Sequence, residues 1–134
     1  MKITFTCEGH ENIQAKHRNT LEFTKDEHVT LRGDCIVGVS ADFDSQEILE
    51  FAARHDSAKI TITAGKEKEI VRFEINKDFN DTQEIVLRRG WFNSPRTLGI
   101  GTDRACVDFS QKFRENLKSG TIKVELEDED TKKI

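Results

Sequence analysis

The chain has 134 residues, of which 35% are hydrophobic and 34% charged, with a net charge of −4. This length favours one domain over residues 1–134. The acidic balance argues against bulk, sequence-independent nucleic-acid binding, which depends on neutralising phosphates. No run approaches the roughly 20 apolar residues of a membrane helix, and no signal peptide is visible, so we expect a cytoplasmic protein without a membrane partner. The three cysteines form no CxxC, which fits a reducing compartment.

The first part of the chain predicts three strands and a helix. Residues 2–7 and 15–24 alternate between apolar and polar, as half-buried strands do, and the second run places His17 on the face of Leu21 and Phe23. Residues 34–40 are apolar on both faces, which predicts a central strand. Ser45 is a suitable N-cap for a helix that follows, with an apolar stripe of Ile48, Leu49 and Ala52.

The remainder predicts a hairpin, two strands, a second helix and a last strand. Residues 58–64 and 69–76 alternate on either side of a Gly-Lys turn, and residues 84–89 and 96–100 are extended around a loop that holds the one tryptophan. Apolar residues at helical spacing predict a helix over 106–117 that stops before Gly120. Residues 121–127 alternate as a closing strand, and residues 128–134 form a charged tail.

Two stretches of the chain resemble each other. Residues 31–63 match residues 87–126 with insertions, and "GVSAD" at 38–42 pairs with "GIGTD" at 99–103. This pattern predicts an α+β domain that is an internal duplication of two ββ-β-α units, about 1–57 and 58–120, plus the closing strand, in a mixed or mainly antiparallel sheet. The alternative is that the two stretches are similar by chance, because any two ββ-β-α units share alternating apolar residues in their strands and capping residues at their helices.

The periodicities also predict which side chains form the core. Twelve of them should be largely buried: Phe5, Leu21, Phe23, Val37, Val39, Leu49, Ile60, Ile62, Phe73, Phe113, Ile122 and Val124.

Three segments together resemble a known family. They are "GHENIQAKHRNTLEFTKD", "RGDCIVGVSAD" and "SPRTLGIGTDRACVDF", and they look like the archaeal domain-of-unknown-function family 371. The resemblance covers nearly the whole chain, although Thr102 stands where similar members tend to carry alanine. It implies an archaeal cytoplasmic protein, and it brings no activity and no catalytic residue.

The stretch "GHENIQAKH" at residues 9–17 is the first candidate site. His10 and His17 could hold a divalent metal, the one cofactor that this sequence suggests, with Asp34 or Cys35 completing the shell. We expect the Asp34 carboxylate to approach one of the two imidazoles. The more ordinary interpretation is that His10 caps a turn and that His17 forms hydrogen bonds on a half-buried face.

The sequence contains candidates for two further kinds of site, a cysteine nucleophile and an anion-binding loop. Cys35 beside a histidine could be a nucleophile, but a cysteine within an apolar run more often packs as a small hydrophobe. A basic loop precedes a helix N-terminus and could bind an anion, whereas solvated arginines are the alternative. Its anion-binding candidates are Arg88, Arg89 and Arg104.

Three classes of function follow from these residues, and the sequence leaves open whether the protein is an enzyme. The first is a small-molecule enzyme or ligand-binding protein with a polar site at strand ends between the two halves, taking a small anionic ligand. The second is a metal-binding protein that uses His10 and His17, and the third is a non-catalytic module that contacts protein or RNA through residues 88–104. The ligand-binding candidates of the first class are His10, Glu11, Asn12, His17, Asp34 and Arg96.

Overall fold

The computed structural model describes residues 1–130, which form eight strands, two α-helices and one 3₁₀ turn. The strands are β1 (Lys2–Glu8), β2 (Thr20–Thr24), β3 (Ile36–Gly38), β4 (Ser57–Ala64), β5 (Glu67–Ile75), β6 (Glu84–Arg88), β7 (Thr97–Ile100) and β8 (Thr121–Asp128). The helices are α1 (Ser45–Arg54), the 3₁₀ turn η1 (Cys106–Asp108) and α2 (Gln111–Asn116).

All eight strands belong to one mixed, mainly antiparallel sheet that closes on itself. The strand order is β1-β8-β4-β5-β7-β6-β2-β3. Glu8, at the end of β1, then bridges Val39, just after β3, through N–H···O bonds of 2.7 and 2.9 Å. These two hydrogen bonds connect the two ends of the strand order, so each terminal strand has a partner on its outer side at this point.

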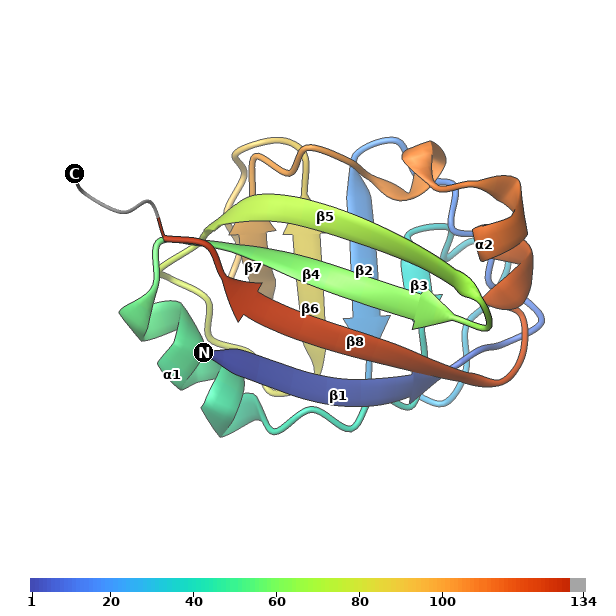
Figure 1. The fold of residues 1–134 in the computed structure, drawn as a ribbon, viewed down its shortest axis with the longest axis horizontal. Coiled ribbons are helices and arrows are strands. Elements are labelled where there is room, and N and C mark those ends of the chain that lie inside the picture. The colour runs from blue at the N-terminus through green and yellow to red at the C-terminus, as the bar shows by residue number, and fades with distance from the viewer. Residues whose placement is uncertain (131–134) are drawn as a thin grey trace.

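The closed sheet forms two layers that enclose the core. In Figure 1, β5, β4, β8 and β1 run across the view, and β7, β6, β2 and β3 cross behind them at a steep angle. The helix α1 lies at one end of the molecule and α2 at the other. Side chains that alternate inward from both layers meet between them, so the core follows directly from the period of two in the strands.

The core prediction is confirmed for eleven of its twelve residues. Leu49 is the exception, because it is half-buried while Phe51 takes the deeper place on α1. Phe5 packs edge-on against both Phe23 and Phe43, with ring centroids 5.7 and 5.5 Å apart. These contacts tie β1 to β2 and to the segment that leads into α1.

Several expected boundaries are wrong. The run 15–24 is not one strand, because Ala15 has a positive φ of 49° and only Thr20–Thr24 pair in the sheet. His17 therefore lies in a loop and not on the face of Leu21. The helix expected over 106–117 is divided, because Phe109 and Ser110 are extended and Ser110 caps α2. The strand β3 is buried on both faces as expected, but it stands at one end of the strand order.

The two halves of the chain pair in the same pattern. Both β2–β3 and β6–β7 are parallel pairs with a register shift. If each strand of β1–β4 is renamed as its counterpart in β5–β8, and the reverse, every strand of the closed sheet keeps the same two neighbours. The Asp42 N–H and carboxylate bind the backbone of Thr6, and those of Asp103 bind the backbone of Arg72 in the same way.

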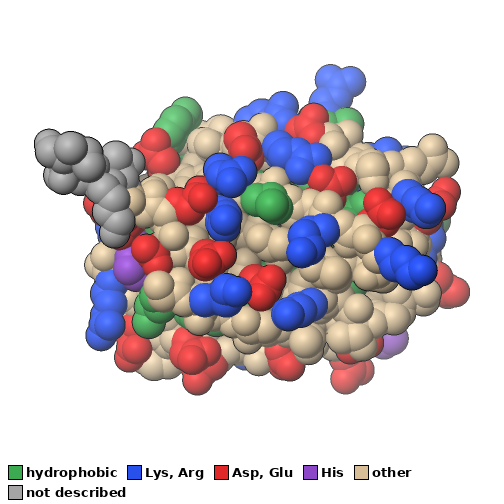
Figure 2. Space-filling view, in the orientation of Figure 1, with side chains coloured by type: hydrophobic (Ala, Val, Ile, Leu, Met, Phe, Trp, Pro, Cys, Tyr) green, Lys and Arg blue, Asp and Glu red, His purple; other side chains and the backbone are tan. Residues whose placement is uncertain are grey.

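The outer surface of the front layer carries interspersed charges of both signs. In Figure 2, Lys and Arg side chains alternate with Asp and Glu over β5, β4 and β8, and no single-sign patch forms. Within the part of the chain that the structure describes, no helix is long and apolar enough to cross a membrane.

Candidate functional site

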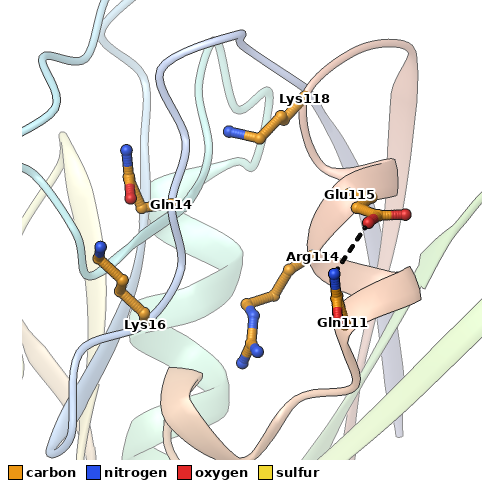
Figure 3. Close-up of a pocket in the computed structure, with 6 residues that line it drawn as sticks. All are labelled: Gln14, Lys16, Gln111, Arg114, Glu115 and Lys118. Carbon is orange, nitrogen blue, oxygen red and sulfur yellow. Dashed lines mark hydrogen bonds between the residues drawn. The ribbon is translucent and has the colours of Figure 1, made fainter.

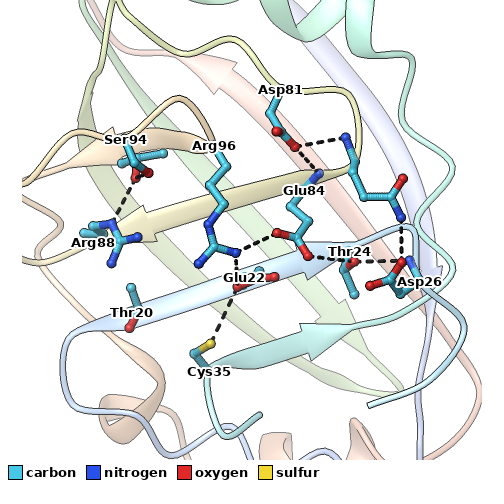
Figure 4. A network of polar contacts seen from close by, with 12 residues as sticks. Thr20, Glu22, Thr24, Asp26, Cys35, Asp81, Glu84, Arg88, Ser94 and Arg96 are labelled. Carbon is cyan, nitrogen blue, oxygen red and sulfur yellow. Dashed lines mark hydrogen bonds and ion pairs between the residues drawn. The ribbon is translucent and has the colours of Figure 1, made fainter.

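Polar side chains line the outer face of the two central strands of the back layer. On β2 and β6, Leu21, Phe23, Ile85 and Leu87 point into the core, so the alternate residues point outward. In the antiparallel register Thr20 lies opposite Arg88, Glu22 opposite Val86 and Thr24 opposite Glu84. We call these six residues the outer strip; Figure 4 shows the polar ones and their contacts.

Glu22 is the one charged side chain that is buried among the described residues, with 5% of its surface exposed. The guanidinium of Arg96 lies 3.6 Å from its carboxylate and 2.6 Å from that of Glu84 (Figure 4). Burial and the neighbouring Glu84 charge raise the pKa of Glu22 to about 7, although Arg96 opposes the shift. A carboxyl group that exchanges its proton near neutral pH is suited to acid–base chemistry.

Cys35 borders the strip but is not an activated nucleophile. Its thiol lies 3.7 Å from Oε1 of Glu22 and donates to it (Figure 4). Burial and the Glu22 charge raise the pKa of Cys35 to about 12, so the thiolate is disfavoured at neutral pH. The packing interpretation of Cys35 is therefore the better one, with a weak hydrogen bond to Glu22 added.

Two pockets meet at one end of the outer strip. One, of about 430 Å³, is lined by His17, Asn19, Thr20, Arg88, Gly90 and Phe92. The other, of about 400 Å³, is lined by Lys16, His17, Arg18, Asn19 and Asp34. Because His17 and Asn19 line both, the two pockets adjoin, and together we call them the His17 pocket.

Backbone donors fix the tautomer of His17. Its Nδ1 accepts the N–H groups of Asn19 and Thr20 at 3.0 and 3.1 Å. An N–H group can only donate, so Nδ1 carries a lone pair and the proton of the neutral ring is on Nε2. His17 therefore offers an N–H donor, and its Nδ1 lone pair is already used.

His10, Glu11 and Asn12 make their hydrogen bonds to groups other than Asp34, whereas the backbone N–H groups of Lys16 and His17 donate to the Asp34 carbonyl. The His10 Nδ1 accepts the N–H of Asn12 at 3.0 Å, and the His10 ring lies 6.1 Å from that of His28. The Asn12 side chain donates to the Val29 carbonyl, and the Glu11 carbonyl accepts from Lys118. Asp34 lines the His17 pocket, but within residues 1–130 no hydrogen bond or ion pair joins its carboxylate to either histidine.

The arginines of residues 88–104 differ in whether a carboxylate neutralises them. Arg89 pairs with Asp108, and Arg104 pairs with Glu69 at 2.6 Å and also lies over the Phe109 ring. Arg88 instead donates to the hydroxyl of Thr97 at 2.9 Å and lies over the ring of Phe92. Of the three expected anion-binding arginines, Arg88 is thus the one whose charge the described residues leave uncompensated.

A third pocket, beside α2, uses its cations for structure. Figure 3 shows Lys16, Gln14 and four residues of the α2 region around it. Arg114 donates to the backbone carbonyl of Phe109, and Lys118 donates to those of Glu11 and Ile13. These bonds hold η1 and the 10–14 loop against α2, so these two cations already have partners.

One group of possible metal ligands occurs in the described residues, and it contains neither His10 nor His17. It consists of His55, Asp128 and Asp130. The Asp130 carboxylate accepts from the His55 ring and from the N–H groups of Asp56 and Ser57, which lowers the pKa of Asp130 to about 2. These bonds fasten the end of β8 to the C-terminus of α1, which accounts for the cluster without an ion.

Glu22 and Glu84 were missed from the sequence. Arg96 was expected at the site, but its carboxylate partners, Glu22 and Glu84, lie on β2 and β6, which are distant from each other in sequence. The one available signal was the composition "TLEFT", in which a lone glutamate stands among threonines on the outer face of a short strand. That pattern is also typical of a solvated strand face, so only the tertiary structure shows that Glu22 is covered.

Two comparisons with known proteins identify the family of the chain. The model of the domain of unknown function DUF371 matches residues 5–129. The chain belongs to the DUF371 family. The DUF371 chain is also 31% identical over 126 residues to the uncharacterized protein MJ0206 of Methanocaldococcus jannaschii, covering 90% of this chain and 93% of that protein. The expected family is thereby confirmed, and because neither match names an activity, function has to be argued from the site.

Proposed function

We propose that this DUF371 protein binds a small molecule on the outer strip and uses Glu22 for proton transfer to or from it. The observation that carries the proposal is the buried Glu22 beside Glu84 and Arg96. Burying a charged carboxylate costs several kcal/mol unless it is paired, and here the single cation is shared with a second carboxylate. Carboxyl groups with strongly perturbed pKa values are concentrated at functional sites, which supports the proposal.

The site has the surroundings that a ligand needs. The segments 25–35 and 89–96 connect the parallel pairs β2–β3 and β6–β7, and the outer strip lies on these strands. The His17 pocket opens at the Thr20–Arg88 end, two residue pairs along the ladder from Glu22. A ligand held there lies against Thr20, which is the neighbour of Glu22 on the same face of β2.

A screen of small metabolites by NMR chemical-shift perturbation tests this proposal. Hits should shift Thr20, Glu22 and Arg88 signals, and their affinity should change between pH 6 and pH 8 because Glu22 titrates in this range. In Glu22→Gln the pH dependence should disappear, whereas the matched control Glu47→Gln, on the exposed face of α1, should retain it. Hits that perturb another surface, or a pH dependence unchanged in Glu22→Gln, would contradict the proposal.

A second candidate, a module that contacts protein or RNA, is favoured by one observation. Trp91 and Phe92 are 64% and 68% exposed on the same loop, next to Arg88 and Arg89. Adjacent exposed aromatic residues are unusual on a surface without a partner, and they are suited to stacking on bases or to a protein interface. Trp91 fluorescence on titration with single-stranded RNA tests the RNA form of this candidate.

We also infer that the fold arose by duplication of β1–β4 as β5–β8, which changes the expected boundaries to about 2–64 and 67–128. The identical pairing pattern and the matched Asp42 and Asp103 contacts support this. A positive φ occurs at both Ser40 and Gly101, at equivalent points after β3 and β7. A crystal structure in which β1–β4 superpose on β5–β8 tests it, and a different path of the chain in each half would contradict it.

A further inference from the structure

We infer that the His17 pocket is an anion subsite that holds the phosphate group of a small molecule. Lys16, Arg18 and Arg88 all line it, and the structure describes no carboxylate within ion-pair distance of any of the three. This inference deepens the proposed function, since it states the chemical class of the molecule whose other end reaches the outer strip.

The charge balance separates this pocket from the rest of the basic surface. Arg89, Arg96 and Arg104 are each neutralised by an acidic partner, and Arg114 and Lys118 donate to backbone carbonyls. Against the three uncompensated cations the pocket has one carboxylate, that of Asp34. The chain as a whole has a net charge of −4, so this local excess of positive charge is not a consequence of composition.

The neutral groups of the pocket are also donors to an anion. The tautomer of His17 leaves its Nε2–H free to donate, because both of its backbone hydrogen bonds go to Nδ1. The Asn19 side chain lines the same cavity and can donate as well, whereas the Thr20 hydroxyl donates to His17 Nδ1 across 2.7 Å. Phosphate oxygens accept several such hydrogen bonds at once. A guanidinium group binds phosphate more strongly, because it can donate two parallel, charge-assisted hydrogen bonds.

The position of the pocket fits a bipartite ligand. Arg88 and Thr20 are opposite one another at the pocket, and Glu22 follows Thr20 by two residues on the same face of β2. These residues lie about 7 Å apart along the strand, which is the length of a small organic group beyond a phosphate. The two cavities have volumes of about 400 and 430 Å³, and Thr20, the neighbour of Glu22 on this face of β2, lines the second.

Isothermal titration calorimetry with inorganic pyrophosphate and with ribose 5-phosphate tests the inference at low salt. Wild type should bind at least one probe, and affinity should fall at high salt because the contacts are charged. Arg88→Gln and Arg18→Gln should each weaken binding by about tenfold. The matched control Arg54→Gln removes the same charge from α1, which contributes no residue to the pocket, and should bind as wild type does.

The outcomes are decisive in both directions. Tighter binding of pyrophosphate would identify a free inorganic anion as the source of the phosphate group. Tighter binding of ribose 5-phosphate would identify a phosphorylated metabolite as the source. Either result supports the subsite. Absence of binding of both probes, or an equal loss in Arg54→Gln, would overturn it. Glu22→Gln should retain pyrophosphate binding, so loss of the anion subsite and loss of the Glu22 role are distinguishable.

Discussion

The thiol of Cys35 donates to the carboxylate of Glu22 across 3.7 Å, so a weak neutral donor, and not a second cation, fills the remaining side of this buried carboxylate. Arg96 is the one positive group that opposes the raised pKa of Glu22. The Glu22 charge is therefore only partly compensated, and its protonation should be visible in the stability of the fold.

Stability should fall as pH rises through the titration of Glu22. Its pKa is raised from 4.5 to about 7 in the folded protein, so the folded state holds the proton more tightly than the unfolded state. The resulting stabilisation is complete below about pH 4.5 and is lost as pH rises to about 7, by roughly 1–3 kcal/mol. Glu22→Gln should remove this component, which urea unfolding between pH 4.5 and 8 measures. The control Glu27→Gln, at an exposed loop position, should retain the wild-type slope; an unchanged slope in Glu22→Gln would refute the assignment.

Gly101→Ala should destabilise the protein and displace Trp91. Gly101 has a φ of 60°, and a Cβ there would lie 2.6 Å from the Trp91 ring. Left-handed backbone costs a residue with a Cβ about 1–2 kcal/mol, and the ring has to move as well. Since Trp91 is the one tryptophan, its emission spectrum reports the displacement directly.

Ser40→Gly is the matched substitution at the equivalent point of the first half. Ser40 already has a φ of 51°, so glycine should relieve strain there and leave stability equal to wild type or higher. A loss of more than about 1 kcal/mol in Ser40→Gly would show that its side chain has a role that the backbone argument omits.

Asp42→Ala should cost more than Asp103→Ala. The Asp42 carboxylate accepts both the backbone N–H and the hydroxyl of Thr6, at 2.8 and 3.0 Å, whereas that of Asp103 accepts the N–H of Arg72 at 2.9 Å. At about 1 kcal/mol per bond we expect losses of about 2 and about 1 kcal/mol. Thermal unfolding of both variants gives the comparison, and the reverse order would contradict it.

Phe113→Ala should cost roughly 3–5 kcal/mol, as deletions of large aromatic side chains in packed cores do. Phe113 is fully buried on α2 and packs edge-on against Phe109, with ring centroids 5.0 Å apart. Denaturant unfolding measures the loss. A loss below about 1 kcal/mol would mean that this end of the core is able to collapse around the deletion.

The sequence alone determined the order of the strands and helices and most of the side chains that form the core, but not the bounds of 15–24 and 106–117. Val37, Ile60, Phe73 and Val124 could be predicted because alternation with a period of two is a local property, and turns at residues such as Gly65 end each run. The family could also be identified from the sequence, since its motifs are linear. The matching segments 38–42 and 99–103 were visible for the same reason, because both contain a short glycine-bearing turn before an aspartate.

Only the tertiary structure decided which residues that are distant in sequence become neighbours. Glu22 and Glu84 share Arg96 because β2 pairs with β6, and pairing between distant strands is set by the packing of the whole sheet and not by local pattern. The loop form of 15–19 follows from the positive φ of Ala15, which no propensity of alanine indicates. His17 could be named from the sequence, but its tautomer and its cationic neighbours depend on backbone N–H groups and side chains that only the folded loop brings together.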